Sequence, residues 1–122
     1  MKAIKQYQSA SVEAAIDVAS PHNITLMLFD GAIKNLHIGK SAHLSNDWQR
    51  RSESISKSQA IVTTLAATLN DDAAPELCEN LRRLYDFVLS ATGEFMLNGE
   101  VEKIDSCIKV LKEIKSGWEA IG

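Results

Sequence analysis

The apolar residues of this chain recur at helical spacing in four segments, each bounded by residues that cap or break helices. The first segment begins at Ser20-Pro21, because serine is a favoured N-cap and proline at the first helical position loses no hydrogen bond that the helix could have made. The remaining limits come from the same kinds of signal, namely Leu44 for the first segment, Asp47 and Asn70-Asp71-Asp72 for the second, and Pro75 and Asn98-Gly99 for the third.

The apolar stripes indicate how these helices pack. The second segment carries a stripe with a seven-residue repeat, Trp48, Ile55, Val62 and Leu69. The third has a broader face, Leu77, Leu81, Leu84, Tyr85, Val88 and Leu89. The fourth has a narrow seam of coiled-coil type, Ile104, Cys107, Leu111, Ile114, Trp118 and Ile121. Strand signals are scarce and the connections are short, so we predict an all-α, antiparallel up-down four-helix bundle in which Trp48 and Trp118 are at least partly buried.

The first segment has apolar residues on two sides of one helix. One side carries Leu26, Phe29, Ile33, Leu36 and Leu44, and the opposite side carries Ile24, Met27, Leu28, Gly31, Ile38, Gly39 and Ala42. A bundle core accounts for one face. The second face could be covered by neighbouring helices, by the N-terminal arm or by a partner protein. In the third helix Phe87 projects about 80° from the centre of its apolar face, so it could line a groove or be a single exposed aromatic residue.

Residues 1–19 form an arm or a short extra helix before the bundle of residues 20–122, and the whole chain, residues 1–122, is predicted to be one domain. The apolar residues of this arm follow approximate helical spacing, with Val12 off the stripe formed by Ile4, Tyr7, Ala14, Ala15 and Val18. The arm could dock weakly into a groove and be displaced, or it could be an ordinary frayed terminus.

Composition and charge narrow the classes of function. The chain has 122 residues, of which 45% are hydrophobic and 24% charged, with a formal net charge of -3. This balance disfavours nucleic acid and anionic membranes as partners, because both select for excess Lys and Arg. No apolar run approaches the ~20 residues of a membrane span, so we expect a cytoplasmic protein without membrane insertion. Cys78 and Cys107 fall within helical patterns and are expected to be reduced core thiols.

Residue combinations typical of catalysis are scarce, and we expect no enzyme activity, metal or cofactor. Gly39-Lys40-Ser41 lacks the earlier glycine of a phosphate-binding loop, since Lys34 stands there. The three histidines do not share one helix face, which disfavours a zinc site. One alternative function is histidine phosphotransfer. His37 and Lys40 have the one-turn spacing found in phosphotransfer bundles, although Ser41 stands where that family's pattern has glycine. Another alternative is an oligomeric structural bundle that buries the second apolar face against itself.

Several stretches together resemble the FliS family of flagellin export chaperones. "YQSASVEAAIDVAS" places Tyr7 five residues before Val12 and is followed by Pro21. "LMLFDGAI" contains the family's Leu-Tyr/Phe-Asp-Gly as Leu28 to Gly31, and "NLRRLYDFV" resembles its third-helix pattern. The resemblance covers nearly the whole chain. It departs at Ser90-Ala91-Thr92-Gly93, where many members have an Arg-Arg pair followed by apolar residues.

The resemblance implies a function and a partner. FliS-like proteins bind the C-terminal segment of unpolymerised flagellin in the cytoplasm, prevent premature polymerisation and support flagellar type III export, and the export apparatus is a further expected partner. The implied client groove comprises Ile24, Met27, Leu28, Gly31 and Ile38, with Phe87 at its rim. The implied arm contacts, which occupy part of this surface when no client is present, are Ile4, Tyr7 and Val12. The free chain is expected to be a monomer or a weak oligomer.

Overall fold

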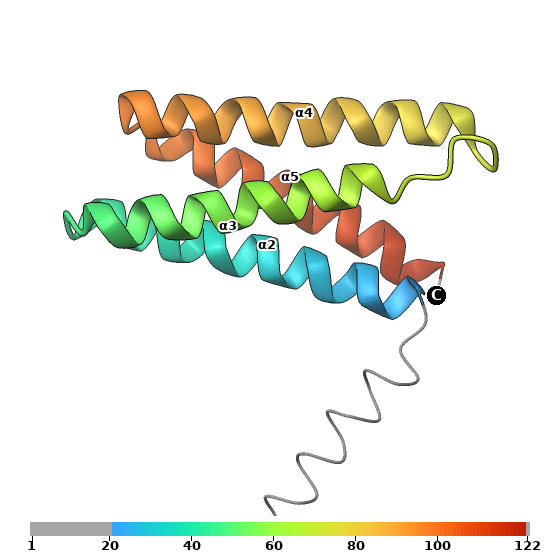
Figure 1. The fold of residues 1–122 in the computed structure, drawn as a ribbon, viewed down its shortest axis with the longest axis horizontal. Helices are drawn as coiled ribbons and strands as arrows, with labels where there is room; N and C mark the ends of the chain where they lie inside the picture. Colours follow the sequence, from blue (N-terminus) through green and yellow to red (C-terminus); the bar gives the residue numbers. More distant parts are fainter. Residues whose placement is uncertain (1–20, 122) are drawn as a thin grey trace, which may run out of the picture.

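Residues 21–121 are described by a computed structural model, and within this range four α-helices and no strand occur. The helices are α2 (Pro21–Leu44), α3 (Trp48–Ala67), α4 (Pro75–Asn98) and α5 (Val101–Ala120). They run alternately up and down along one long axis (Figure 1). The prediction of an all-α, antiparallel four-helix bundle is confirmed. Residues 1–20 lie outside the described range, and so does the predicted arm.

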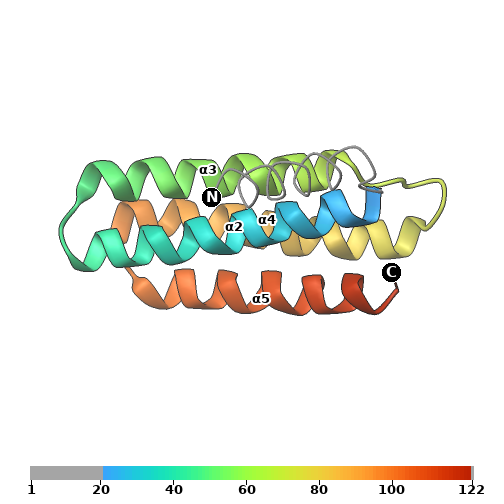
Figure 2. The ribbon, with the colours of Figure 1, turned by 90° about the horizontal axis from the view of Figure 1, so that it is seen from below.

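The four helices form a ring of neighbours. α2 packs against α3 and α5, and α4 packs against the same two helices, so that α2 and α4 lie on a diagonal. Figure 2 shows this arrangement, with α3 and α5 on either side of the pair formed by α2 and α4. Each helix therefore has two flanks in contact with other helices and one outer face.

The helix ends follow the local signals in the sequence. The Asp47 side chain accepts a hydrogen bond of 3.2 Å from the backbone N–H of Arg50 and so caps α3. Gly99 ends α4 in the left-handed conformation, with φ of 69°, and its N–H donates to the Phe95 carbonyl at 2.8 Å. A side chain at Gly99 would also meet the His43 ring, because a Cβ atom there would lie 2.9 Å from His43 Cε1. The predicted limits of the third helix and the predicted start of the second are confirmed, but α3 ends at Ala67, before Leu69 and the predicted stop at Asn70-Asp71-Asp72.

The core is built from large apolar side chains of all four helices. The largest fully buried ones include Phe29, Leu36, Ile55, Leu65, Phe95, Ile104 and Leu111. Cys78 and Cys107 are free and buried, as expected. The seam predicted for the fourth helix is buried at Ile104, Cys107 and Leu111, but Ile121 at its end is exposed.

Trp48 is more exposed than its place on an apolar stripe suggests. Its exposed fraction is 51%, whereas Trp118 is partly buried as predicted. Trp48 is the first residue of α3, at the end of the bundle, and no further layer of residues 21–121 covers its ring. The Arg51 guanidinium lies over the indole at 4.9 Å from its centroid, and His43 meets it edge-on at 5.6 Å. The ring therefore packs on the end of the bundle and not within the core.

Candidate functional site

α3 covers part of the second apolar face of α2. Gly39 and Ala42 are buried, and a Cβ atom placed on Gly39 would lie 2.5 Å from Cδ1 of Ile55. At Gly31 a Cβ atom would lie 3.3 Å from Cδ1 of Ile61. The small residues of this face thus allow α3 to approach closely. A neighbouring helix, and not a partner protein, covers this half of the face.

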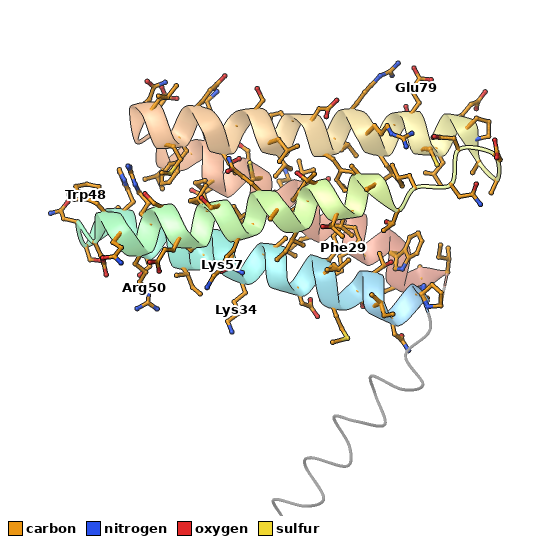
Figure 3. The ribbon with its side chains drawn as sticks, viewed as in Figure 1. Phe29, Lys34, Trp48, Arg50, Lys57 and Glu79 are labelled. Carbon is orange, nitrogen blue, oxygen red and sulfur yellow. The ribbon has the colours of Figure 1, made fainter. Side chains whose placement is uncertain are left out.

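The other half of the face remains open on the folded bundle. Met27 is 57% exposed and Ile24 is 48% exposed, while Leu28 and Ile38 are partly buried. We call Ile24, Met27, Leu28 and Ile38, together with Gly31 at the border with α3, the α2 strip. Figure 3 shows the contrast along this helix, in which Phe29 points into the bundle and Lys34 points away from it. The α2 strip offers apolar contacts to a partner without unfolding the core.

Phe87 belongs to α4 and not to the helix that carries the α2 strip, so its place at the rim of the client groove stays a prediction. It is exposed on α4. α4 packs against α3 and α5 but has no direct backbone contact with α2. The periodicity of a helix indicates which way a side chain points but does not say which helices are neighbours. The predicted arm contacts Ile4, Tyr7 and Val12 lie outside the described residues.

One end of the bundle contains a pocket of about 730 Å³, where α2 and α4 begin and α3 and α5 end. We call it the end pocket. Its apolar lining includes Ile24, Leu28, Leu65, Leu81, Ile114 and Trp118. Its volume lies within the range of small-ligand and anchor sites. Because Ile24 and Leu28 belong both to the pocket lining and to the α2 strip, the two features form one continuous surface.

Specific contacts hold the walls of the end pocket in place. The Trp118 indole N–H donates to the His22 carbonyl oxygen at 3.1 Å, and the His22 and Trp118 rings stack at 5.5 Å. Lys115 pairs with Asp30 at 2.6 Å, which also joins α5 to α2. On the opposite side the Cys78 thiol donates to the Asn70 carbonyl oxygen at 3.3 Å. These contacts fix the Trp118 and Cys78 sides of the lining.

Tyr85 adds a phenol hydroxyl to a mainly apolar lining that also contains Thr25, Thr68, Asn70 and Glu113. It lines the end pocket, is only 3% exposed, and its ring lies against Phe29 with centroids 6.5 Å apart. Burial raises the pKa of the phenol to about 12, so the hydroxyl stays protonated at neutral pH. The hydroxyl makes no hydrogen bond to any of residues 21–121.

The sequence did not reveal the end pocket. Leu81, Tyr85, Ile114 and Trp118 were all interpreted as core positions because they lie on apolar stripes. That spacing indicates the inward face of each helix but not whether the opposing walls meet. One signal was present: Gly117 lies beside Trp118 in the last turns of α5 and contributes no side chain where the pocket opens.

The structure gives little support to the phosphotransfer alternative considered from the sequence. His37 is exposed, and the Lys40 ammonium that would assist a phosphorylated imidazole instead pairs with Asp105 at 2.7 Å. Across the described range no cluster of His, Cys, Asp or Glu could hold a metal ion. Nor is any helix in that range long and apolar enough to cross a membrane. The features that remain are the α2 strip and the end pocket, both suited to binding apolar side chains.

Comparison with known proteins decides the family. Residues 3–122 match the family described as flagellar protein FliS. The chain belongs to the FliS family. This family is one of chaperones and not a known class of enzymes, and the comparisons give no support to a phosphotransfer bundle.

FliS relatives match over almost the full chain. The flagellar secretion chaperone FliS of Vibrio cholerae is 30% identical over 118 residues, which are 97% of this chain and 87% of the relative. FliSB of Pseudomonas aeruginosa, also named a flagellar secretion chaperone, is 31% identical over 121 residues, which are 99% of this chain and 96% of the relative. A crystal structure described as a flagellar chaperone from bacteria superposes with a TM-score of 0.78 at 21% identity, covering 96% of this chain and 95% of the other, which supports the fold.

Proposed function

We propose that this chain is a cytoplasmic flagellar secretion chaperone that binds the C-terminal segment of unpolymerised flagellin and prevents its polymerisation before export. The observation that carries this proposal is the α2 strip, because a chain of the FliS family presents exposed Ile24 and Met27 on a folded bundle. Large apolar residues that stay exposed beside a cavity are typical of surfaces that bind another protein.

The α2 strip provides the client groove in this proposal. An amphipathic segment of flagellin lies along α2 and folds as it binds, which is helix-in-groove recognition coupled to folding. Burying one Leu, Ile or Phe side chain contributes roughly 1.5–3 kcal/mol, so a few anchors offset the cost of ordering the client. No nucleotide or cofactor takes part, because the binding free energy comes from burial alone.

The N-terminal arm of residues 1–19 regulates this groove in the same proposal. Ile4, Tyr7 and Val12 dock on the apolar surface when no client is present and leave it when flagellin binds. The arm is covalently attached to Pro21, which lines the end pocket, so it acts at a high effective concentration even if its contacts are weak. The free chain then remains a monomer or a weak oligomer, and the loaded chain is delivered to the export apparatus.

Inhibition of polymerisation tests the proposal. Purified flagellin from the same organism is induced to polymerise and followed by light scattering, with and without an equimolar amount of this chain. We expect the chain to suppress filament growth and to co-elute with full-length flagellin but not with flagellin that lacks its C-terminal segment. Unchanged polymerisation, or co-elution with the truncated flagellin to the same extent, would refute the proposal.

A further inference from the structure

A lysine without a counter-ion lies within the α2 strip. Lys34 is three residues after Gly31 and four before Ile38, so helical spacing places it on the same side of α2 as both. It is exposed and points away from the bundle (Figure 3). Among residues 21–121 no acid forms an ion pair with Lys34. Any partner that covers the α2 strip must therefore meet this ammonium group.

Two further cations lie on the same side of the molecule. Lys57 and Arg50 are exposed on α3, and their side chains form no ion pair within the described range. The residue after Lys57, Ser58, donates to the Ala32 carbonyl oxygen of α2 at 3.0 Å, which sets Lys57 across from the part of α2 that carries Lys34. Figure 3 shows the three cations on one side of the α2–α3 pair, with Arg50 nearer the turn between the helices. We call Lys34, Arg50 and Lys57 the basic cluster.

The acids one helical turn before the two lysines have other partners. Asp30, one turn before Lys34, pairs with Lys115 of α5 at 2.6 Å. Glu53, one turn before Lys57, accepts a hydrogen bond of 3.1 Å from a glutamine side chain of its own helix. Cations that gather without counter-ions repel one another, so the basic cluster does not stabilise the free bundle. Its charges are available to a bound partner.

The surroundings of the basic cluster indicate the chemistry of this partner. The whole chain has a net charge of -3, so the cluster is a local feature and not part of a generally basic surface. Met27 and Ile38 of the α2 strip are apolar neighbours of Lys34 on the same helix face. Apolar residues alone could not cover the cations without a cost, because burial removes the water that solvates them. Carboxylates replace that water with charge-assisted hydrogen bonds, which points to a polypeptide helix with apolar and acidic residues on one side.

We propose that the basic cluster selects acidic residues of the flagellin segment that binds along the α2 strip, with carboxylates of one client helix paired to the three cations. The inference rests on the proposed function and adds to it a requirement on the charge of the client. Arg50 and Lys57 are seven residues apart on α3, which is roughly 10 Å along its axis. The matching client helix therefore carries two acids about two turns apart, beside its apolar face.

Neutralising the two lysines tests this inference without changing the apolar contacts. Lys34→Gln/Lys57→Gln removes both charges and keeps similar helix propensity. Lys109→Gln/Lys112→Gln is the matched control, because these lysines of α5 are also exposed and form no ion pair with residues 21–121. Both double variants change the net charge equally, so a difference between them reports the position of the charges. Neither loses an ion pair, so both should unfold at the same urea concentration as wild type.

The affinity for a flagellin C-terminal segment, fused to a soluble carrier, is measured by isothermal titration at about 30 mM and about 300 mM salt. We expect wild type to bind roughly three- to tenfold more weakly at the higher salt, because salt screens the charge pairs. At low salt Lys34→Gln/Lys57→Gln should bind roughly three- to tenfold more weakly than wild type and lose most of the salt dependence, while the control stays within about twofold. Equal affinities, or the same loss in both double variants, overturn the inference but leave the proposed function intact. Absence of binding to wild type refutes the proposed function and the inference with it.

A charge exchange tests whether the pairing is direct. Lys34→Glu/Lys57→Glu should bind the natural segment more weakly still. A segment whose acidic residues are replaced by lysine should bind this variant more tightly than it binds wild type. No such recovery overturns the direct pairing.

Sedimentation with vesicles of anionic phospholipid tests a membrane as the other source of negative charge. We expect wild type to stay in solution. Co-sedimentation that Lys34→Gln/Lys57→Gln abolishes, with an unchanged affinity for the flagellin segment, would assign the basic cluster to a membrane surface and overturn the inference.

Discussion

Trp118 donates its indole N–H to the carbonyl oxygen of His22 at 3.1 Å and stacks its ring on the His22 imidazole at 5.5 Å. This pair joins the last turns of α5 to the first turn of α2. It therefore fixes one wall of the end pocket and the point from which the N-terminal arm departs. The relationship connects the stability of the bundle to the geometry of the proposed client site.

Replacing Trp118 by phenylalanine keeps an aromatic ring and removes the hydrogen bond. We expect the free energy of unfolding to fall by roughly 0.5–1.5 kcal/mol and the amide protons of the first turns of α2 to exchange faster. Urea unfolding and hydrogen exchange followed by NMR measure both effects. Trp48→Phe is the control, because the half-exposed Trp48 donates no hydrogen bond to the described residues. Unchanged exchange in α2 would show that the His22 contact does not hold the helix start.

The close approach of α2 and α3 predicts a destabilising substitution at Gly39. In Gly39→Ala the new Cβ atom would lie 2.5 Å from Cδ1 and 2.9 Å from Cγ1 of the buried Ile55, so the helices must separate or Ile55 must shift. We expect the free energy of unfolding to fall by roughly 1–3 kcal/mol. Gly93→Ala, which meets no atom, should instead be neutral or stabilising by up to about 1 kcal/mol. Chemical denaturation compares the two, and equal stability would contradict the packing described here.

Two buried acids predict a loss of stability at alkaline pH. Burial raises the pKa of the Cys107 thiol from 9.0 to about 11, against a smaller opposing effect of Lys103, and raises that of the Tyr85 phenol from 10.0 to about 12. Both pKa values are higher in the folded chain, so both contributions are fully present below the unfolded values and are lost as the pH rises through the folded ones.

The free energy of unfolding should therefore decrease between pH 9 and pH 12, by up to roughly 2–3 kcal/mol for each group. Urea unfolding at a series of pH values measures this slope. Tyr85→Phe should remove the part above pH 10, and Cys107→Ala should remove the part that begins near pH 9. A slope that neither variant changes would mean that other groups cause the alkaline loss.

Removing the arm tests whether it competes with the client. Deletion of residues 1–12 should expose apolar surface and so increase binding of a hydrophobic dye. It should also raise the affinity for the flagellin segment, and the gain should grow with the fraction of free chains in which the arm is docked. Tyr7→Ala should change affinity in the same direction but less, because the phenol ring is the largest arm contact. Weaker binding with an intact fold would instead mean that the arm clamps the client.

The helices and their ends were predictable because the signals that set them are local. Asp47 caps α3 and Gly99 ends α4 through contacts within a few residues of each. The seam of α5 at Ile104 and Leu111 was predictable for a similar reason, since three- and four-residue spacing places these side chains on one face.

The site could be predicted only in part, because it depends on distances between helices. The two apolar faces of α2 were apparent, but the sequence could not indicate that α3 buries Gly39 while Met27 stays in water. The end pocket depends on how far the four helix ends separate, and the same apolar spacing would have fitted a closed core at Leu81 and Trp118. The sequence also could not indicate that α4, which carries Phe87, lies diagonal to α2, because helix neighbours are a property of the whole fold.

The most direct test of the account is isothermal titration of the flagellin C-terminal segment into this chain and into Met27→Asp. Met27 is 57% exposed, so the substitution places a charge on the α2 strip without disturbing the core. Leu97→Asp is the control, since Leu97 is 85% exposed on α4. We predict one segment per chain for wild type and for Leu97→Asp, and a loss of at least tenfold in affinity for a folded Met27→Asp. No heat of binding with wild type, or equal affinity for all three proteins, would contradict the account.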